Sequence, residues 1–549
     1  MEDFSNNKSI EDSGDFGPIP TAKKGGWITL PFILATVAGL SMAYGGLVSN
    51  LEVYLIQEFN IERISAAKIY NATNAIISIL PVAAAILADS FLGCYSVIWI
   101  SSLITSLGLL LLILTAALSK LRPPPCESGS SDPCKTPTLI QHTALYLGLG
   151  LVSVGLAGTR FTVGSIGAYQ FDKSKQQGVF FNWFTFVIYI SYVMSSTAIV
   201  YVESYVSWAW GFGICFATNT LALMLFLAGT SFYRQMKPHG SPFASLARVV
   251  VAAVRKSGVT HSHNPDDYCQ GHDYGTPALP TKFLWCLNGA AFRTEWDIGQ
   301  QGKMTKSWKL CTVTEVEDFK CLIKLVPLWI SSLIVSTPLV IQLSMVNLQA
   351  LSMDRHLGQK LEIPAGTMPI FIFMSTCITI FFVDRLLLKM WNKITCKPIS
   401  PLQRVGIGHV LNVVSMAVLA LVEAKRLKMA RLHNLQGQDI NAVVPMSIFW
   451  LVPSLALAGI GEGFHFPGQI SFYYKEFPKH LKSTSTAVFS LCIGIGFYMG
   501  NGLIDIVRGS TDWLPENLNN GRLDNVYWLV TALGGINFCY FLLCTSLYK

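Results

Sequence analysis

Charged residues are scarce in this chain of 549 residues. Asp, Glu, Lys and Arg together make up 13% of it, and hydrophobic residues make up 51%. A soluble globular protein carries about 25% charged residues. A deficit spread over the whole chain indicates that most residues lie where charge is costly, which is the interior of a lipid bilayer. The composition therefore favours a membrane protein over a large soluble enzyme.

Motifs for metals, redox chemistry and catalysis are also missing. The 13 cysteines include no Cys-x-x-Cys pattern, and no phosphate-binding loop, metal-ligand spacing or catalytic triad is present. We therefore expect no cofactor, no metal and no enzymatic activity. Cys126 and Cys134 are the exception among the cysteines. They flank a Pro/Gly/Ser-rich loop that we place outside the cytosol, where a disulfide could persist.

We expect neither a secretory signal peptide nor a nucleic-acid-binding surface in this chain. Its first 20 residues are polar and acidic, without a basic start and an apolar core, so the first span is expected to serve as the uncleaved signal. The net charge of +8 comes from short basic clusters beside apolar runs, such as Arg255–Lys256 and Lys479–Lys482. This placement is the one that the positive-inside bias predicts, and we expect no nucleic-acid partner.

Twelve apolar runs are long enough to cross a bilayer, which takes about 20 residues. The first six lie near 27–56, 66–88, 95–119, 142–167, 180–202 and 208–230. The second six lie near 321–348, 364–388, 403–423, 444–466, 484–508 and 525–546. The sequence thus predicts an all-α membrane protein with twelve transmembrane helices in two six-helix bundles, the major-facilitator fold.

One long polar interruption separates the two sets of spans. It predicts a disordered cytosolic N-terminus at 1–26, a first bundle at 27–230, a cytosolic linker at 231–320 and a second bundle at 321–549. An even number of spans puts both termini on one side of the membrane, and the basic clusters make that side cytosolic.

Two segments of this predicted topology need an interpretation of their own. The basic stretch Glu423–Arg431 falls outside the cell, and we interpret it as the snorkelling end of a long ninth helix. Within the linker, Ser241–Lys256 has the pattern of an amphipathic helix with a basic end, which we expect to lie along the inner membrane surface.

Short motifs at regular positions run from about residue 25 to the C-terminus. They are Ala88–Gly93, Gly155–Arg160, Gly167–Asp172, Phe180–Trp183, Trp210–Gly213, Pro238–Pro242, Trp308–Glu315, Met353–Arg355, Pro401–Gly408, Phe472–Tyr473 and Phe477–Pro478. Together they resemble the plant nitrate/peptide transporter family, a branch of the proton-dependent oligopeptide transporters. The segments Gly158–Thr162, Ile199–Tyr201 and Gly461–Gly468 are similar to the nitrate excretion subgroup of that family.

The resemblance also shows what the first helix has lost. Proton-coupled members carry Glu-x-x-Glu-Arg shortly before a segment that here is Ala43–Gly46; the matching positions hold Val37, Leu40 and Ser41. None of these side chains binds and releases a proton in the working range. We therefore expect transport without proton coupling. The alternative is that coupling has moved to another carboxylate, such as Glu462 or Glu52.

Two charges remain inside the spans, and each needs a partner there. Arg160 lies in the fourth span and Glu462 in the tenth. These helices face each other across the cavity in the family, so the resemblance implies that the two residues pair. Such a pair is either a permanent brace or a bridge that breaks as the inward gate opens and frees Arg160 for an anion. We favour the second interpretation, because a buried pair alone is weak evidence for stability.

Other residues of the spans are weaker candidates. His465 follows Glu462 by three residues and could tune that carboxylate or sense pH, or it could be a structural hydrogen-bonding residue. Tyr44, Asn74 and Tyr473 are polar or aromatic candidates for the cavity, and each could equally be packing. The histidine that binds nitrate in the seventh span of a dual-affinity relative has no counterpart, since His356 falls beyond that span.

The turn after the second span is interpreted as structural. Asp89 and Gly93 form a short turn that braces or gates the first bundle, and Cys94 stands where the family usually has Arg.

These features lead to one functional hypothesis and several alternatives. We expect a carrier that moves a small anionic solute, nitrate and also chloride, out of a plant cell by alternating access. The alternatives are a carrier of a specialised metabolite such as a glucoside or alkaloid, a proton-coupled nitrate carrier with a non-standard carboxylate, and a transport-inactive receptor. We expect a multi-pass protein of the plasma membrane rather than the vacuolar membrane, a monomer or weak homodimer in the lipid bilayer.

Overall fold

The computed structural model describes most of the chain. The described residues are 24–125, 135–160, 162–234, 242–257, 262, 264–270, 279–294, 308–358, 361–383, 387–395, 399–436, 440, 442–477 and 482–548. The candidate disulfide Cys126–Cys134 lies outside these ranges, as does most of the N-terminal segment 1–26.

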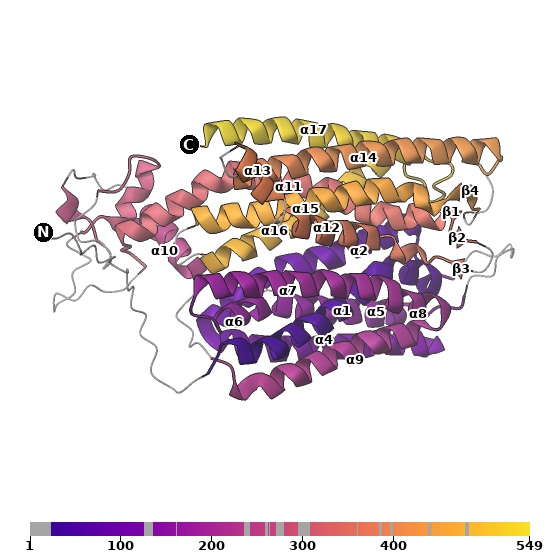
Figure 1. Cartoon of the computed structure of the whole chain (residues 1–549), viewed down its shortest axis with the longest axis horizontal. Helices are drawn as coiled ribbons and strands as arrows, with labels where there is room; N and C mark the ends of the chain where they lie inside the picture. Colours follow the sequence, from indigo (N-terminus) through magenta and orange to yellow (C-terminus); the bar gives the residue numbers. More distant parts are fainter. Residues whose placement is uncertain are drawn as a thin grey trace, which may run out of the picture.

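Long helices run side by side along the molecule, with the first half of the chain on one side and the second half on the other (Figure 1). The first half contains α1 (Leu30–Phe59), α2 (Arg63–Ile79), α3 (Pro81–Leu87), α4 (Gly93–Ala117), α5 (Leu139–Arg160), α6 (Thr162–Ala168), α7 (Ser174–Met194), α8 (Val200–Tyr205) and α9 (Trp208–Ala228). The second half contains α11 (Val313–Leu351), α12 (Ile370–Phe382), α13 (Leu388–Thr395), α14 (Pro401–Leu432), α15 (Val452–Glu476), α16 (Lys482–Ser510) and α17 (Leu523–Leu547).

Eleven helical stretches of the described residues are long and apolar enough to cross a membrane. One of them, Arg63–Ala117, is 55 residues long. About 20 residues suffice for one crossing, so this stretch holds two spans, with a turn between them at Gly93. The spans therefore number twelve, as the sequence predicts. The ninth helix continues past the predicted end at 423 to Leu432, and the seventh begins earlier than predicted, at Val313.

The two ends of the helix array differ. At one end lie the C-terminus and α10 (Pro242–Arg255) of the linker, and at the other lie four short strands (Figure 1). β1 (Met353–Asp354) pairs in parallel with β4 (Val444–Ser447). β2 (His356–Leu357) pairs antiparallel with β3 (Leu361–Glu362). Following the predicted topology, we call the linker end the inner end and the strand end the outer end.

The linker helix α10 buries its apolar face against protein. Val249 and Ala252 are fully buried in a small core with Tyr268, Ala290 and Val316. The sequence pattern is amphipathic because this face packs on the linker itself. This face is therefore covered by protein, while Val250 and Val254 of the same helix are exposed, and the position of α10 along the inner membrane surface stays a prediction.

In the basic stretch at the end of α14, Arg426 is buried where it was expected to snorkel, whereas Lys425, Lys428 and Arg431 are exposed. Arg426 and Glu423 are both 0% exposed. Arg426 donates from Nε and Nη2 to the two Glu423 carboxylate oxygens, each at 2.7 Å, and from Nη1 to Asn519 Oδ1 at 2.6 Å. Gln349 Nε2 of α11 donates to Glu423 Oε2 at 2.6 Å. The prediction fails here because α11 and the loop before α17 enclose the end of α14.

Candidate functional site

Three of the predicted site residues lie together where α1, α2 and α5 meet. The Arg160 guanidinium, at the end of α5, lies over the Tyr44 ring of α1, 5.3 Å from its centroid. The Tyr44 hydroxyl donates to Asn74 Oδ1 of α2 at 2.9 Å. Asn74 is buried, and Arg160 is partly buried. The structure thus places a cation beside an aromatic ring and an amide, a combination that suits an anionic ligand.

Further aromatic side chains extend this site to the second half of the chain. The ring of Tyr192 on α7 lies 5.5 Å from Tyr44, 6.3 Å from Tyr189 and 5.2 Å from Phe373 on α12. We call Tyr44, Tyr189, Tyr192 and Phe373 the aromatic cluster. Sequence reasoning missed its last three members, although the i, i+3 spacing of Tyr189 and Tyr192 puts both on one side of α7.

Arg160 and Glu462 do not form an ion pair in this structure. Glu462 on α15 is buried and interacts with the side chain of Thr376 on α12. Tyr189 on α7 interacts electrostatically with both Arg160 and Glu462. The expected pairing is therefore absent from this conformation, in which α7 presents an aromatic side chain to each of the two charges.

Of the two interpretations of His465, its contacts favour the structural one. Its ring packs 5.2 Å from that of His409 on α14, and Gly408 of α14 lies against its Cβ. A Cβ at Gly408 would meet His465 Cβ at 2.6 Å, so the glycine lets α14 approach this face of α15 closely. The carboxylate of Glu462 meets α12 instead. His465 therefore belongs to the packing of the second half.

Tyr473 also belongs to the interior of the second half. It is 1% exposed, and its hydroxyl accepts from Gln469 Nε2 at 2.7 Å and lies 3.4 Å from Ser332 Oγ of α11. The contact with Ser332 joins α15 to α11, and Tyr473 lies apart from the aromatic cluster.

The positions that have lost the proton-binding motif lie in a hydrophobic environment. Val37 and Leu40 of α1 are buried in a core with residues such as Ile98, Val163 and Phe226. Leu40 lies one helical turn before Tyr44, so the two share a side of α1. An aliphatic side chain thus stands one turn from Tyr44, where coupled relatives have a carboxylate.

Two other predicted features are local. Gly93 has φ of +76°, a conformation that favours glycine, at the turn between α3 and α4. His356 lies exposed in the strand pair at the outer end, with Nδ1 2.7 Å from Asp354 Oδ1. This hydrogen bond lowers the pKa of Asp354. Neither feature contacts the aromatic cluster.

The outer ends of the two halves are joined by ion pairs. Lys68 Nζ of α2 lies 2.5 Å from Asp505 Oδ1 of α16, and Arg508 Nη2 of α16 lies 3.4 Å from Glu62 Oε2 of the first half. Arg508 is also held from its own half by Glu516 Oε1, at 3.2 Å, and we count Glu516 with these pairs. Within the described ranges, the ion pairs between the halves all lie at this end. We call them the outer seam, and they must open if the site is to face outward.

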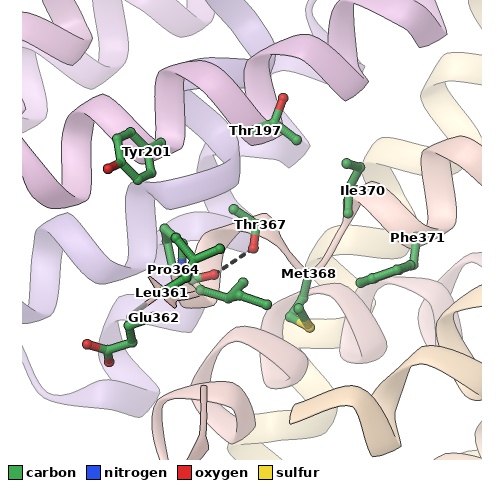
Figure 2. A pocket seen from close by; sticks show the side chains of 10 residues that line it. Thr197, Tyr201, Leu361, Glu362, Pro364, Thr367, Met368, Ile370 and Phe371 are labelled. Atoms are coloured by element: carbon green, nitrogen blue, oxygen red, sulfur yellow. Dashed lines mark hydrogen bonds between the residues drawn. The ribbon is translucent and has the colours of Figure 1, made fainter. Parts of the chain in front are cut away.

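A surface cavity of about 240 Å³ lies apart from the aromatic cluster (Figure 2). Its walls come from the helical turn Ser195–Ile199 and α8 on one side and from β3 to α12 on the other. They include Thr197, Tyr201 and Phe371. Below them Thr367 Oγ1 donates to the carbonyl oxygen of Pro364 at 2.7 Å (Figure 2). Its lining includes none of the predicted site residues.

Two packed helical halves with a charged and aromatic site where they meet define a carrier of the major-facilitator type. Residues 95–519 match the model of the POT family. The chain belongs to this family, and it is a multi-pass membrane transporter rather than an enzyme.

Similar proteins can be aligned with nearly the whole chain. "Protein NRT1/ PTR FAMILY 2.3" of Arabidopsis thaliana is 47% identical, covering 99% of this chain and 96% of the relative. "Protein NRT1/ PTR FAMILY 2.7" of the same plant is 46% identical, covering 96% and 93%. Among solved structures, the POT family transporter PepTSo matches with a TM-score of 0.68 at 17% identity, covering 95% of this chain and 99% of that one. An auto-inhibited POT family peptide transporter matches with a TM-score of 0.66 at 18% identity, covering 95% and 96%.

These comparisons confirm the family and the twelve-helix fold that the sequence predicts. The solute, the direction of transport and the choice of membrane do not follow from them.

Proposed function

We propose that this transporter carries nitrate, and also chloride, by alternating access without proton coupling. The observation that supports it best is Arg160 beside Tyr44, a cation at the meeting of the two halves that is not neutralised by Glu462 in this conformation. A guanidinium offers several N–H donors in one plane, which suits a small planar oxyanion such as nitrate.

The absence of coupling rests on the first helix. Val37, Leu40 and Ser41 replace the groups that bind the proton in coupled relatives, and the first two are buried among apolar side chains. Without a proton, the driving force is the nitrate gradient and the membrane potential. The potential is worth about 2.3 kcal/mol per charge per 100 mV, so an anion moves downhill out of a negative-inside cell. We therefore propose export at the plasma membrane.

We also propose how the binding site becomes accessible from the other side of the membrane. The outer seam closes the outer end, and Arg160 is free of Glu462. We propose that the outward-facing state breaks the outer seam and brings α5 and α15 together at the inner end, so that Arg160 pairs with Glu462. Nitrate and Glu462 then compete for the same guanidinium, which releases the anion as the pair forms.

The proposal is tested with purified protein in liposomes loaded with labelled nitrate, at a potential fixed by potassium and valinomycin. We expect efflux to follow the potential and to stay constant when a proton gradient is imposed at fixed potential. Labelled chloride should leave by the same route, and unlabelled nitrate should slow it. Nitrate flux that rises several-fold with the proton gradient would contradict the proposal.

A second candidate is a carrier of a bulky metabolite such as a glucoside or alkaloid. The aromatic cluster favours it, because flat rings stack on tyrosine and phenylalanine. In the same liposomes this candidate predicts uptake of a metabolite of this kind with no nitrate flux.

A further inference from the structure

The carboxyl group of Glu52 is buried and unpaired in the outer half of α1. Glu52 lies eight residues beyond Tyr44, about 12 Å along the helix, and its exposed fraction is 0%. Neither carboxyl oxygen has a partner of proper hydrogen-bond geometry. The transport mechanism proposed above does not use this group.

Its neighbours come from both halves of the molecule. Asn347 of α11 is the polar side chain that acts on the carboxyl, and Tyr70 of α2 is the titratable group that interacts with it. Asn347 is 1% exposed, and its Oδ1 also lacks a hydrogen-bond partner. No charged side chain of the described residues forms an ion pair with Glu52. The carboxyl group therefore faces a neutral amide across the contact between α1 and α11.

These surroundings suit a neutral carboxylic acid better than a carboxylate. An ionised carboxylate with no cation and only one neutral amide beside it is strongly disfavoured in a membrane interior. A carboxylic acid has one O–H donor, and an unpaired amide oxygen is an acceptor for it. When the two halves separate at the outer end, water reaches the group and the charged form becomes acceptable.

We propose that Glu52 is a proton-binding site that must be occupied for the outer end of the carrier to close. The proton comes from the outer solution and returns to it when α1 and α11 separate again. External acid therefore favours the closed outer end, while no proton crosses the membrane. The inference rests on the proposed function only for its alternating access.

Glu203 provides a matched control. It is also buried with both oxygens unpaired, and its neighbouring amide is Asn50. However, the direct neighbours of Glu203 on α8 are Gly211 of α9 and Asn50 of α1, both in the first half, and only Asn50 in turn lies against the second half, at Gly366. Glu203 keeps these direct neighbours when the halves separate, so it should respond less than Glu52 to the opening of the outer end.

The test measures how often the outer end opens. Ser344 on α11 is fully buried and lies 3.5 Å from Asn71 Nδ2 of α2, so a cysteine there reacts with an external reagent only when the halves separate. The labelling rate of Ser344→Cys by a membrane-impermeant maleimide is measured in cells without nitrate, at external pH values from 5 to 8. The same rate is measured in two double variants, Ser344→Cys with Glu52→Gln and Ser344→Cys with Glu203→Gln. A chain that keeps Ser344 gives the background labelling of the other cysteines.

The informative quantity is the labelling rate of the chain that keeps Glu52 divided by the rate of the Glu52→Gln variant, because ionisation of the thiol affects both alike. We expect this ratio to be near one at pH 5 and to rise toward pH 8, by at most tenfold per pH unit for a single proton. The Glu203→Gln variant should keep the response of the chain with Glu52. A ratio that stays at one throughout would overturn the proposal.

A competing source of pH dependence is Glu516 in the outer seam, whose pKa is raised by burial and by the charge of Glu62. A response that survives Glu52→Gln and disappears with Glu516→Gln overturns the proposal. If Glu52→Gln does not reach the cell surface, Asn347→Leu replaces it. Loss of the amide should move the midpoint of the response to higher pH, because the amide favours the charged form of Glu52 and leucine does not. An unchanged midpoint would count against the proposal. Labelling needs no nitrate, so a failure of the proposed substrate leaves this test intact.

Discussion

A single guanidinium is the main chemical group at the meeting of the two halves. Arg160 lies over Tyr44, whose hydroxyl is held by Asn74. A hydrogen bond to a charged group contributes about 1.5–3 kcal/mol, which is enough to decide whether a weakly hydrated anion binds. We therefore expect Arg160 and the Tyr44 ring beside it to set the affinity for the proposed anion.

Removing the charge of Arg160 should weaken transport more than replacing Arg160 with lysine, which keeps the charge. Arg160→Gln is expected to raise the nitrate concentration for half-maximal flux by roughly 10- to 100-fold, the loss of about 1.5–3 kcal/mol. Arg160→Lys should lose less, because it keeps the charge but not the planar group. Both are measured as labelled nitrate flux in liposomes. Arg522→Gln, at an exposed pair near the outer end, is the control and should resemble the wild type; equal loss in both would show that the effect is not local.

Restoring the charges of the first helix should restore a response to protons. The triple variant Val37→Glu, Leu40→Glu, Ser41→Arg places two carboxylates and a cation near Tyr44 in the present apolar core. We expect nitrate flux in this variant to become dependent on the proton gradient. The control Leu40→Met keeps the site apolar at a cost below about 1.5 kcal/mol. If the triple variant folds and its flux ignores the proton gradient, the account of the lost coupling is wrong.

At the scale of elements, the outer end of the second half is fixed by an enclosed ion pair. Glu423 and Arg426 lie on one turn of α14, and their partners come from α11 and from the loop at Asn519. Both Glu423 carboxylate oxygens accept hydrogen bonds, and Arg426 donates from all three of its guanidinium nitrogens. A buried ion pair is tolerated when its remaining hydrogen-bonding groups are satisfied in this way.

Breaking this pair should destabilise the protein strongly. Arg426→Met leaves Glu423 as an unpaired buried charge, and we expect a loss of about 3–5 kcal/mol. Arg522→Met removes one partner of a pair with Asp524, but Arg522 is 47% exposed, so the loss should stay below about 1 kcal/mol. Thermal unfolding in detergent measures both. Similar melting temperatures for the two variants would show that the Glu423–Arg426 pair does not hold this end together.

The outer seam should respond to reversal of its charges. Lys68→Glu places two carboxylates opposite each other at Asp505, and we expect Ser344→Cys to react faster with an external reagent. The double variant Lys68→Glu, Asp505→Lys restores an attractive pair and should return the rate toward that of the parent. The effect is expected to be modest, about two- to fivefold, because exposed ion pairs contribute up to about 1 kcal/mol. No rescue in the double variant would mean that this pair does not close the outer end.

The sequence predicts elements well and side-chain partners less well. Twelve apolar runs of about 20 residues specify twelve spans, because a bilayer imposes their length. The partner of Arg426 could not be predicted, since a basic residue near a helix end snorkels or is enclosed depending on tertiary packing. Likewise, the three-residue spacing of Glu462 and His465 does not reveal that α12 meets one and α14 the other. Tyr189 and Tyr192 were missed because aromatic residues are common in any span.

At the scale of the whole molecule, we propose that the protein is a two-state carrier driven by the membrane potential. The outer seam closes one end, and the aromatic cluster joins the halves at the site. In the opposite state, Arg160 and Glu462 are expected to come together at the inner end. Proton binding at Glu52 would then bias the cycle without supplying energy for it.

The most direct test of uncoupled transport is the reversal potential of nitrate currents under voltage clamp in chloride-free solutions, at external pH 5.5 and 7.5. We predict a shift of about 59 mV per tenfold change in external nitrate, the value for one charge, and no shift with pH, even where the current amplitude changes. A reversal potential that moves with external pH at constant nitrate would show that protons cross with the anion, and would contradict the central claim.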